Sequence, residues 1–395
     1  MQKKAKFKLF RHSSSLIYIG SILLAIYGTV MIISAEMGET TADLGKISST
    51  TIRQLAYLLA GIICIFFFSK FPLMRMYMPY VWGGYGLICA ALIATRAFTP
   101  IGGAYGWIRI GSFSIQPSEF AKFYIIYLAA RLFEIDNPKK NIKNLKYYVI
   151  SALVYVFIVF IIENDLGSAC VIAGIAYVCI LIAPYKEYRK IQNWMMIAMV
   201  AVLLVIALLL TPKGTELISM LGDSYKIKRF LASADPFAYQ YDSGYHLVMS
   251  LVSFATGGLF GLGYNKSIHK YMNFPNPSTD FILPVIVEEM GVVWGLIPIL
   301  ILFGLIVVTL AIYAKRCDYA RGKIIIIGTF MYFILHFILN VGGVSGFIPL
   351  TGVPLLLVSS GGSSLVSCMS ALGMAQNEII NINKKKARKN ENNSR

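Results

Sequence analysis

Long apolar stretches alternate with short charged segments along almost the whole chain. A helix needs about 20 apolar residues to cross the hydrocarbon core of a bilayer, and the pattern predicts ten such helices. No series of alternating strands indicates a membrane β-barrel, so the predicted fold class is an all-α integral membrane protein. The helices are expected near residues 16–34, 53–70, 77–95, 118–133, 147–163, 168–184, 192–211, 281–312, 323–341 and 350–380.

The composition also favours a membrane protein. Of the 395 residues, 57% are hydrophobic and 14% are charged, whereas soluble domains are about 45–50% apolar and about 25% charged. This excess of apolar side chains argues against a soluble enzyme, a secreted domain and a disordered chain. The six cysteines form no CxxC pair, so neither a disulfide framework nor a zinc site is indicated.

The net charge of +17 could indicate a nucleic-acid-binding protein, but the positions of the charges favour another explanation. With the N terminus in the cytoplasm, 25 of the 36 Lys and Arg residues fall in cytoplasmic segments and only four in the short outer loops. Basic residues concentrate on the cytoplasmic side of membrane proteins. The sequence therefore predicts ten spans with both termini cytoplasmic, and no nucleic-acid partner.

The chain is predicted to form one membrane domain, residues 16–382, between basic cytoplasmic tails at 1–15 and 383–395. A large extracytoplasmic loop is expected at 212–279. Within this loop, residues 245–262 are apolar and end in glycines. We expect an interfacial or re-entrant helix pair there, which the polar backbone permits only against protein or water.

Ionisable side chains inside a membrane mark candidate sites, because each costs roughly 2.5–3.5 kcal/mol or more at mid-bilayer. Pro117 suits the start of a helix, with Glu119 in the first turn and Lys122 three residues later on the same face. Two interpretations stay open. The pair neutralises itself inside the protein, or Lys122 binds an anionic group in an outward-facing cavity.

Further carboxylates lie on the same outer side of the predicted bundle. Glu163 and Asp165 occupy a short turn, which needs no function to explain it. Asp280 precedes the eighth span, where an Asp is often a helix N-cap, although this one faces the apolar part of the large loop. Of Glu288 and Glu289, at least one must face the bundle interior, where a structural role is as reasonable as a chemical one.

Segment 340–364 is rich in Gly, Pro and Ser at a membrane boundary. The glycines suit close helix packing, and the backbone N–H groups of 359–364 could instead bind an anion. The four histidines are scattered without the spacing of metal ligands. The residues alone therefore indicate no metal site.

Five segments resemble the SEDS family of shape, elongation, division and sporulation proteins, which includes FtsW, RodA and SpoVE. In chain order they are GWIRIGSFSIQPSEFAK, ENDLGSA, GYHLVMSLVSFATGGLFGLGYNKSIHK, STDFILPVIVEEMG and NVGGVSGFIPLTGVPLLLVSSGGSS. The likeness covers nearly the whole chain.

This resemblance implies an enzyme, a peptidoglycan glycosyltransferase that polymerises lipid II at the outer face of the bacterial cytoplasmic membrane. It also implies partnership with a class B penicillin-binding protein and with other divisome or elongasome membrane proteins. The family's essential Asp corresponds to Asp280, in the motif TDF. Other matching positions are Trp107, Pro117, Glu119, Lys122, Asp165, Ser250, Lys270, Glu289, Asn340 and the run 361–364, which includes Ser363.

The chemistry of the reaction suggests a role for each site residue. Asp280 is expected to be the general base for the acceptor 4-hydroxyl, a role typically worth about 10²–10⁴-fold in rate. Lys122 and Lys270, and less strongly Arg109, would hold the pyrophosphates. No cofactor is evident, although a divalent cation, Mg²⁺ or Mn²⁺, could share that work. The prenyl chain would lie along 245–262 and in grooves between spans.

The chain departs from the family's usual pattern at secondary positions. Gly106 and Asn164 stand where relatives often have Arg and Pro, and His246 stands where Gln is common. Residues 275–278 lack the P-E-x-H run that often precedes TDF. Residues 359–362 read Ser-Ser-Gly-Gly where relatives have Ser-Tyr-Gly-Gly.

Two other classes of function stay open. A lipid II flippase would also carry charges within ten spans, although here they gather in the outer half and no repeated pair of broken helices is apparent. A scaffold that only recruits the penicillin-binding protein would tolerate substitution of Asp280. Segments 235–246 and 258–267 resemble the division branch, FtsW, slightly more than RodA, which predicts a multi-pass plasma-membrane protein at the division septum.

Overall fold

The structure is a computed structural model that describes residues 14–39, 44–72, 75–100, 103–111, 113–134, 138–209, 211–220, 222, 225–272, 274 and 276–393. Its α-helices are α1 (Ser15–Glu39), α2 (Leu44–Lys70), α3 (Met78–Ala94), α4 (Pro117–Leu132), α5 (Pro138–Phe157), α6 (Leu166–Leu181), α7 (Arg189–Leu209), α8 (Pro212–Ser219), α9 (Tyr225–Ala234), α10 (Tyr245–Gly257), α11 (Ile282–Gly291), α12 (Ile297–Arg316), α13 (Ala320–Val344) and α14 (Gly362–Asn393). Short helical turns occur at Thr95–Ala97, Ile158–Ile162, Lys186–Tyr188, His269–Tyr271 and Val292–Leu296, and one hairpin pairs β1 (Ile108–Ile110) with β2 (Phe113–Ile115).

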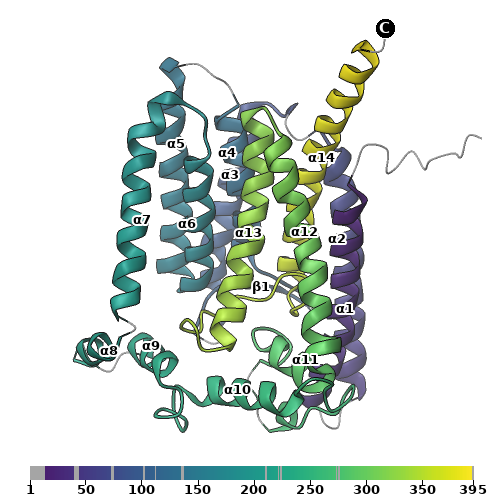
Figure 1. Ribbon diagram of the computed structural model, residues 1–395, viewed down its shortest axis with the longest axis vertical. Coiled ribbons are helices and arrows are strands. Elements are labelled where there is room, and N and C mark those ends of the chain that lie inside the picture. Colours follow the sequence, from purple (N-terminus) through teal and green to yellow (C-terminus); the bar gives the residue numbers. More distant parts are fainter. Residues whose placement is uncertain are drawn as a thin grey trace, which may run out of the picture.

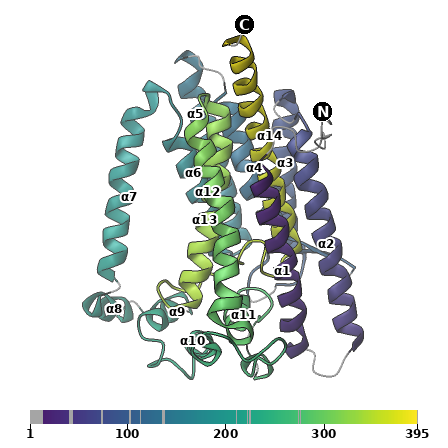
Figure 2. The ribbon, with the colours of Figure 1, turned by 45° about the vertical axis from the view of Figure 1, so that its right-hand side comes forward.

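The long helices run side by side and form a bundle (Figure 1). Helix α2 lies along α14, α1 packs on α12, and α13 packs against α4, α6 and α12. Apolar side chains such as Ile125, Ile172 and Ile325 are fully buried between them. Helix α7 stands apart from the rest (Figure 2), and none of its residues whose burial is described is buried.

Within the described residues, seven segments are long and apolar enough to cross a membrane, which confirms an all-α, multi-pass membrane protein. Three predicted spans correspond to helices outside this set. Helices α4 and α6 have only 16 residues each, and α14 combines 32 residues with a polar C-terminal half. All three pack within the bundle. Because their length and composition do not identify them as spans, the number of ten spans stays a prediction.

The predicted span 350–380 is wrong over its first third. Residues 350–361 form no helix, and α14 begins only at Gly362. Gly352 and Leu357 have φ angles of +71° and +68°, a left-handed conformation that a right-handed helix cannot contain. The apolar run therefore folds back into the bundle as turns and extended chain.

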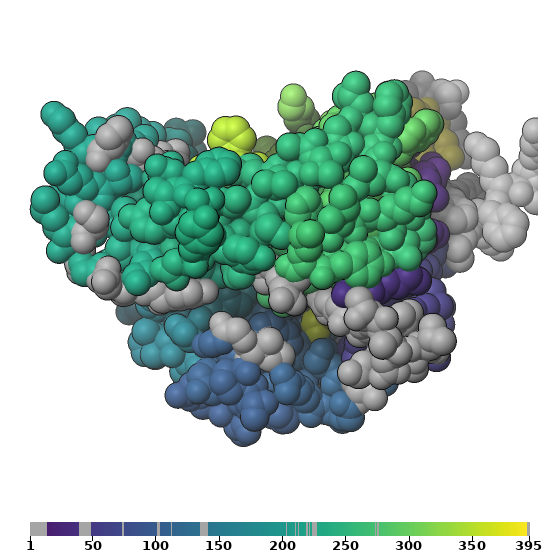
Figure 3. Space-filling model, turned by 90° about the horizontal axis from the view of Figure 1, so that it is seen from below, coloured from purple at the N-terminus to yellow at the C-terminus, as the bar shows by residue number. Residues whose placement is uncertain are grey.

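The large loop covers one end of the bundle, the lower end in Figure 1 and the face toward the viewer in Figure 3. The helix pair predicted within 245–262 is wrong, because this segment contains a single helix, α10, that ends in a turn with positive φ at Gly258 and Gly261. Helix α10 packs against α11 and α13. Figure 3 also shows a hollow between the green loop and the blue segment near residue 110.

The start of α1 and the middle of α14 meet toward the opposite end of the bundle. Ser14 and Gln376 exchange two hydrogen bonds, of 3.1 Å from the Ser14 N–H and 2.6 Å to its carbonyl. With an even number of spans, a chain begins and ends on the same side of the membrane, which agrees with this arrangement. The predicted C-terminal tail, 383–395, continues α14 as far as Asn393, whereas the predicted N-terminal tail lies outside the described residues up to position 13.

Candidate active site

Asp280 lies in the turn that leads into α11, where the large loop meets the bundle. Its backbone carbonyl accepts a 2.9 Å hydrogen bond from Nδ2 of Asn340 in α13. The same amide donates to the carbonyl of Val353, also at 2.9 Å, so one side chain joins three segments. The N-cap interpretation of Asp280 is wrong, because Phe281 holds the cap position and no side chain caps α11.

The carboxylate of Asp280 is half-buried, and its neighbours set its acidity. Burial raises the pKa of Asp280 to about 6; the positive charge of Arg229 in α9 opposes this rise, and Asp165 adds to it. Gly352 leaves room beside the group, since a Cβ at that position would lie 3.5 Å from Oδ2 of Asp280. A carboxyl group with a pKa near neutrality is suited to proton transfer.

Three helix N-termini converge near Asp280. Asp165 caps α6, with Oδ1 accepting a 2.9 Å hydrogen bond from the Ser168 N–H. Its other oxygen accepts from Nε2 of Gln116 at 3.4 Å, and the Gln116 N–H donates to Oγ of Ser363 at 2.9 Å. The starts of α4, α6 and α14 are therefore linked through polar side chains.

Glu163, directly after the apolar span that ends at Ile162, is fully buried. Neither carboxylate oxygen makes a hydrogen bond of ordinary geometry, and the nearby Ser118 hydroxyl only partly offsets the effect of burial. Burial, and then the charge of Asp165, raises the pKa of Glu163 to about 9. The side chain therefore carries a proton at neutral pH.

Glu119 and Lys122 form an ion pair of 2.7 Å whose side chains are 1% and 0% exposed. The hydroxyl of Tyr332 donates to the other oxygen of Glu119 at 3.1 Å. Lys122 also lies 3.3 Å from Nε2 of His336, whose Nδ1 lies 3.0 Å from the carbonyl of Pro354. Because an ammonium group only donates, Nε2 accepts and Nδ1 carries the proton. The geometry thus favours the self-neutralising interpretation of this pair.

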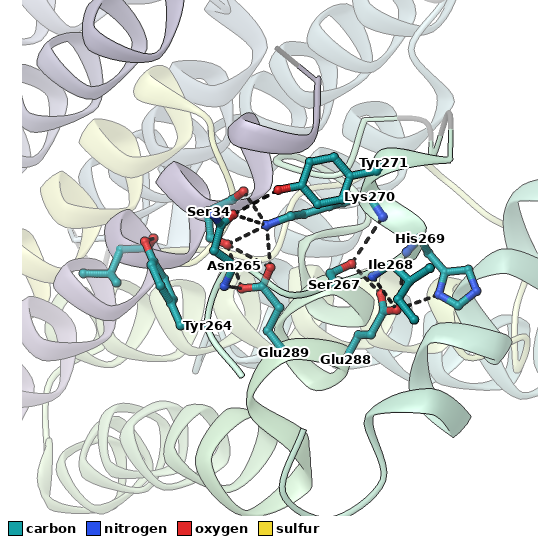
Figure 4. A network of polar contacts seen from close by, with 11 residues as sticks. Ser34, Tyr264, Asn265, Ser267, Ile268, His269, Lys270, Tyr271, Glu288 and Glu289 are labelled. Carbon is teal, nitrogen blue, oxygen red and sulfur yellow. Dashed lines mark hydrogen bonds and ion pairs between the residues drawn. The ribbon is translucent and has the colours of Figure 1, made fainter. Parts of the chain in front are cut away.

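Lys270 and Glu289 form a second buried pair, also at 2.7 Å, with both side chains fully buried. Figure 4 shows that the Lys270 ammonium also donates to the Ser34 carbonyl, the Ser34 hydroxyl and the Asn265 amide oxygen, at 2.9, 2.9 and 2.6 Å. Ser34 donates in turn to the Glu289 carboxylate. The network fastens the large loop to α1 and α11.

Glu288 turns to a separate set of partners in the same view (Figure 4). Its carboxylate accepts from the Ser267 hydroxyl at 2.5 Å and the Ile268 N–H at 3.0 Å. Nδ1 of His269 lies 2.7 Å from it. The adjacent carboxylates, Glu288 and Glu289, thus both face protein and both anchor the loop, which is the structural role considered for them.

Trp107 and Arg109 lie on or next to the small hairpin. Trp107 precedes β1 and is half-buried. Arg109 is exposed on β1, where its guanidinium donates to the Thr99 hydroxyl at 3.1 Å. The structure therefore sorts the predicted site residues into the Asp280–Asp165–Ser363 region, two buried ion pairs and this exposed hairpin.

Among the described residues, no three His, Cys, Asp or Glu side chains come together as metal ligands. A divalent cation at this site would therefore need substrate phosphates as further ligands. The contribution of Mg²⁺ or Mn²⁺ stays a prediction.

No sequence pattern singles out Arg229, which supplies the positive charge acting on Asp280. This residue belongs to a short helix, YKIKRFLASA, in which nothing distinguishes it from its basic neighbours. Gln116 and His336 were also missed. Their partners, Asp165 and Lys122, lie 49 and 214 positions away, and no local pattern reports contacts at such separations.

The fold and the site define a class of protein: a multi-pass helical membrane protein with buried ion pairs and a half-buried carboxylate at one end of its bundle. The model of the FtsW/RodA/SpoVE family of cell cycle proteins matches residues 14–386. The chain belongs to this family, as the five sequence segments predicted.

Relatives with known names are similar over nearly the full length. The probable peptidoglycan glycosyltransferase FtsW of Bacillus subtilis (strain 168) is 30% identical over 362 residues, which cover 90% of this chain and 88% of that protein. Stage V sporulation protein E of the same organism is 29% identical over 373 residues, covering 92% and 95%. The probable FtsW of Taylorella equigenitalis is 32% identical over 333 residues, covering 82% and 85%.

Two solved structures share the fold. A chain of a peptidoglycan synthase complex, described for its coordination of polymerization and crosslinking, aligns with a TM-score of 0.68 at 21% identity, covering 94% of this chain and 98% of that one. The rod shape determining protein RodA of Thermus thermophilus aligns with a TM-score of 0.55 at 20% identity, covering 92% and 96%.

The raised pKa of Glu163 predicts an unusual dependence of stability on pH. The unfolded chain loses this proton near pH 4.5, the ordinary value, whereas the folded protein keeps it up to about pH 9. Stability contributed by this group is therefore full below pH 4.5 and falls as pH rises toward 9. We expect Glu163→Gln to raise the Tm at pH 8 by about 2–5 °C and to flatten the decline with pH.

Thermal unfolding of the purified protein in detergent, between pH 5 and pH 9, would measure this effect. The exposed carboxylate variant Asp318→Asn serves as the matched control, with an unchanged pH dependence. A Glu163→Gln protein that is less stable than the wild type at pH 8 would show that the carboxylate is ionised and paired.

Proposed function

We propose that this protein is a peptidoglycan glycosyltransferase that polymerises lipid II at the outer face of the bacterial cytoplasmic membrane. The names of its relatives support the reaction. The single observation that carries the assignment of the site is the carboxylate of Asp280, half-buried, with a pKa near 6 and a guanidinium nearby. Family membership and this carboxylate together favour an enzyme over a flippase or a scaffold.

Asp280 is the proposed general base. Polymerisation joins the acceptor 4-hydroxyl to the donor sugar and releases undecaprenyl pyrophosphate, so the hydroxyl proton must be removed. A carboxylate with a pKa of about 6 is mostly ionised at pH 7 and still basic enough to accept a proton. The turn fixed by Asn340 would hold this carboxylate in place, and the space beside Gly352 would admit the hydroxyl.

Arg229 is the first candidate for binding the pyrophosphate. Its charge acts directly on Asp280, and a guanidinium can bind phosphate oxygens in pairs. Lys122 and Lys270 remain candidates only if their ion pairs open, because each is fully buried against a carboxylate. Arg109, exposed on the hairpin, would meet a substrate that extends beyond the bundle.

The similarity of this chain to one chain of a solved peptidoglycan synthase complex supports a class B penicillin-binding protein as the partner. Other divisome or elongasome membrane proteins complete the proposed assembly. The relatives include FtsW proteins and a sporulation protein, and we place this chain in the division branch, at the septum. Localisation of a tagged protein to the septum or the side wall distinguishes this placement from the elongation branch.

Asp280→Asn tests the catalytic assignment. We expect polymerisation of purified lipid II to fall by about 10²–10⁴-fold, while folding is preserved. The wild-type rate should rise with pH below about 6 and level off above it, because the base acts only when deprotonated. Asp242→Asn, an exposed carboxylate of the same loop, should leave the rate unchanged. A folded Asp280→Asn protein with full activity would refute the assignment.

Arg229→Gln tests the electrostatic coupling at the site. Since the guanidinium holds the pKa of Asp280 down, its removal should shift the acid limb of the pH–rate profile to higher pH and raise the KM for lipid II. Arg229→Lys, which keeps the charge, should restore the position of the limb. Lys228→Gln, the neighbouring cation, is the control; an unshifted limb in Arg229→Gln would exclude the coupling.

A further inference from the structure

A cleft of about 390 Å³ opens at the end of the bundle opposite the large loop. It lies between the end of α12, the turn that follows, and the C-terminal part of α14. The residues that line it are Arg316, Asp318, Tyr319, Ile382, Asn383, Lys385, Lys386 and Lys389. Its volume is within the range of sites for small molecules, about 300–1,000 Å³.

Hydrogen bonds made by two of the lining residues, Asn383 and Tyr319, hold the walls of the cleft together. Asn383 donates to the Tyr313 hydroxyl at 3.1 Å, which joins α14 to α12. The Tyr319 hydroxyl donates to Glu378 at 2.6 Å, which joins the turn to α14. Arg321 adds an ion pair of 3.2 Å to the same carboxylate. None of these contacts uses a lysine of the cleft.

The lining is strongly basic, with four cations and one carboxylate, Asp318. Lys385 and Lys389 lie one turn apart and therefore project from the same face of α14. Within the described part of the chain, no carboxylate lies within ion-pair distance of the Arg316 guanidinium or of the three lysines. Like charges this close repel one another, so the cleft favours an anionic ligand.

The position of the cleft indicates which kind of anion it binds. The apolar span that includes α12 ends at Arg316, so the cleft lies where the hydrocarbon core gives way to the headgroup layer. Ile382 and the ring of Tyr319 provide apolar wall beside the cations. Basic pockets between spans at the cytoplasmic side suit lipid phosphates.

We propose that this cleft binds the phosphate headgroup of an anionic phospholipid from the cytoplasmic leaflet. The lysines of α14 and Arg316 contact the phosphate, and the acyl chains leave along the apolar surface of α12. A lipid held in this way fixes the depth of α12 and α14 in the bilayer. This site is separate from Asp280 and does not depend on the proposed activity.

The test compares two double variants of the full-length protein, purified and delipidated in a neutral detergent. Short-chain phosphatidylglycerol and phosphatidylcholine are titrated, and bound lipid is counted by native mass spectrometry. Lys385→Gln with Lys389→Gln should weaken phosphatidylglycerol binding by about 25-fold, about fivefold for each lysine. Lys384→Gln with Arg388→Gln, on the same helix but outside the lining, should change it by less than about twofold.

Other outcomes would overturn the proposal. An equal loss in both double variants would indicate diffuse attraction by the whole helix, and equal affinity for phosphatidylcholine would indicate apolar binding only. Inorganic phosphate that displaces the lipid at equal concentration would make this a site for free anions. If binding is absent while an acidic peptide binds, the cleft is a protein-docking site.

The wild-type protein offers a second measurement, which needs no variant. Its affinity for phosphatidylglycerol should fall by at least about fivefold when sodium chloride is raised from about 0.05 M to about 0.5 M, because salt screens exposed charges. An affinity that is independent of salt contradicts a phosphate held by exposed lysines.

Discussion

The ion pair of the buried Lys270 ammonium group with Glu289 is the interaction on which the end of the molecule covered by the large loop depends. A charge placed inside a protein is tolerated only with an opposite charge and a full set of hydrogen bonds, and Lys270 has both, from Glu289, Ser34 and Asn265. These partners come from α11, α1 and the large loop. The chain reaches Asp280 only ten residues after Lys270, so the network anchors the loop close in sequence to this carboxylate.

The position of Asp280 also depends on the side-chain amide of Asn340, which links the end of the large loop to α13 in the bundle. It bonds the carbonyls of Asp280 and Val353 together, so the turn before α11 and the non-helical segment 350–361 are fixed against α13. Burial in this setting raises the pKa of the carboxyl to about 6. The packing that immobilises the carboxyl group therefore also brings its pKa closer to neutral pH.

The sequence could predict features that have a local signature. Apolar run lengths located most of the helices, and the spacing of Glu119 and Lys122 placed them on one face, where they pair. The apolar run 350–361 misled, because such a run alone does not distinguish a helix from buried turns. This segment departs from a helix because its backbone is left-handed at Gly352 and Leu357. Long-range contacts, such as Lys270 with Ser34, leave no trace in local pattern.

The most direct test of the account is the fate of purified lipid II in detergent, where no membrane separates two sides. The protein is supplied with its penicillin-binding partner, and the partner alone is the control. We predict glycan strands, resolved as a ladder on a gel, only when this chain is present. Transport of lipid II across reconstituted vesicles, with no strand formed under either condition, would contradict the account and identify a flippase.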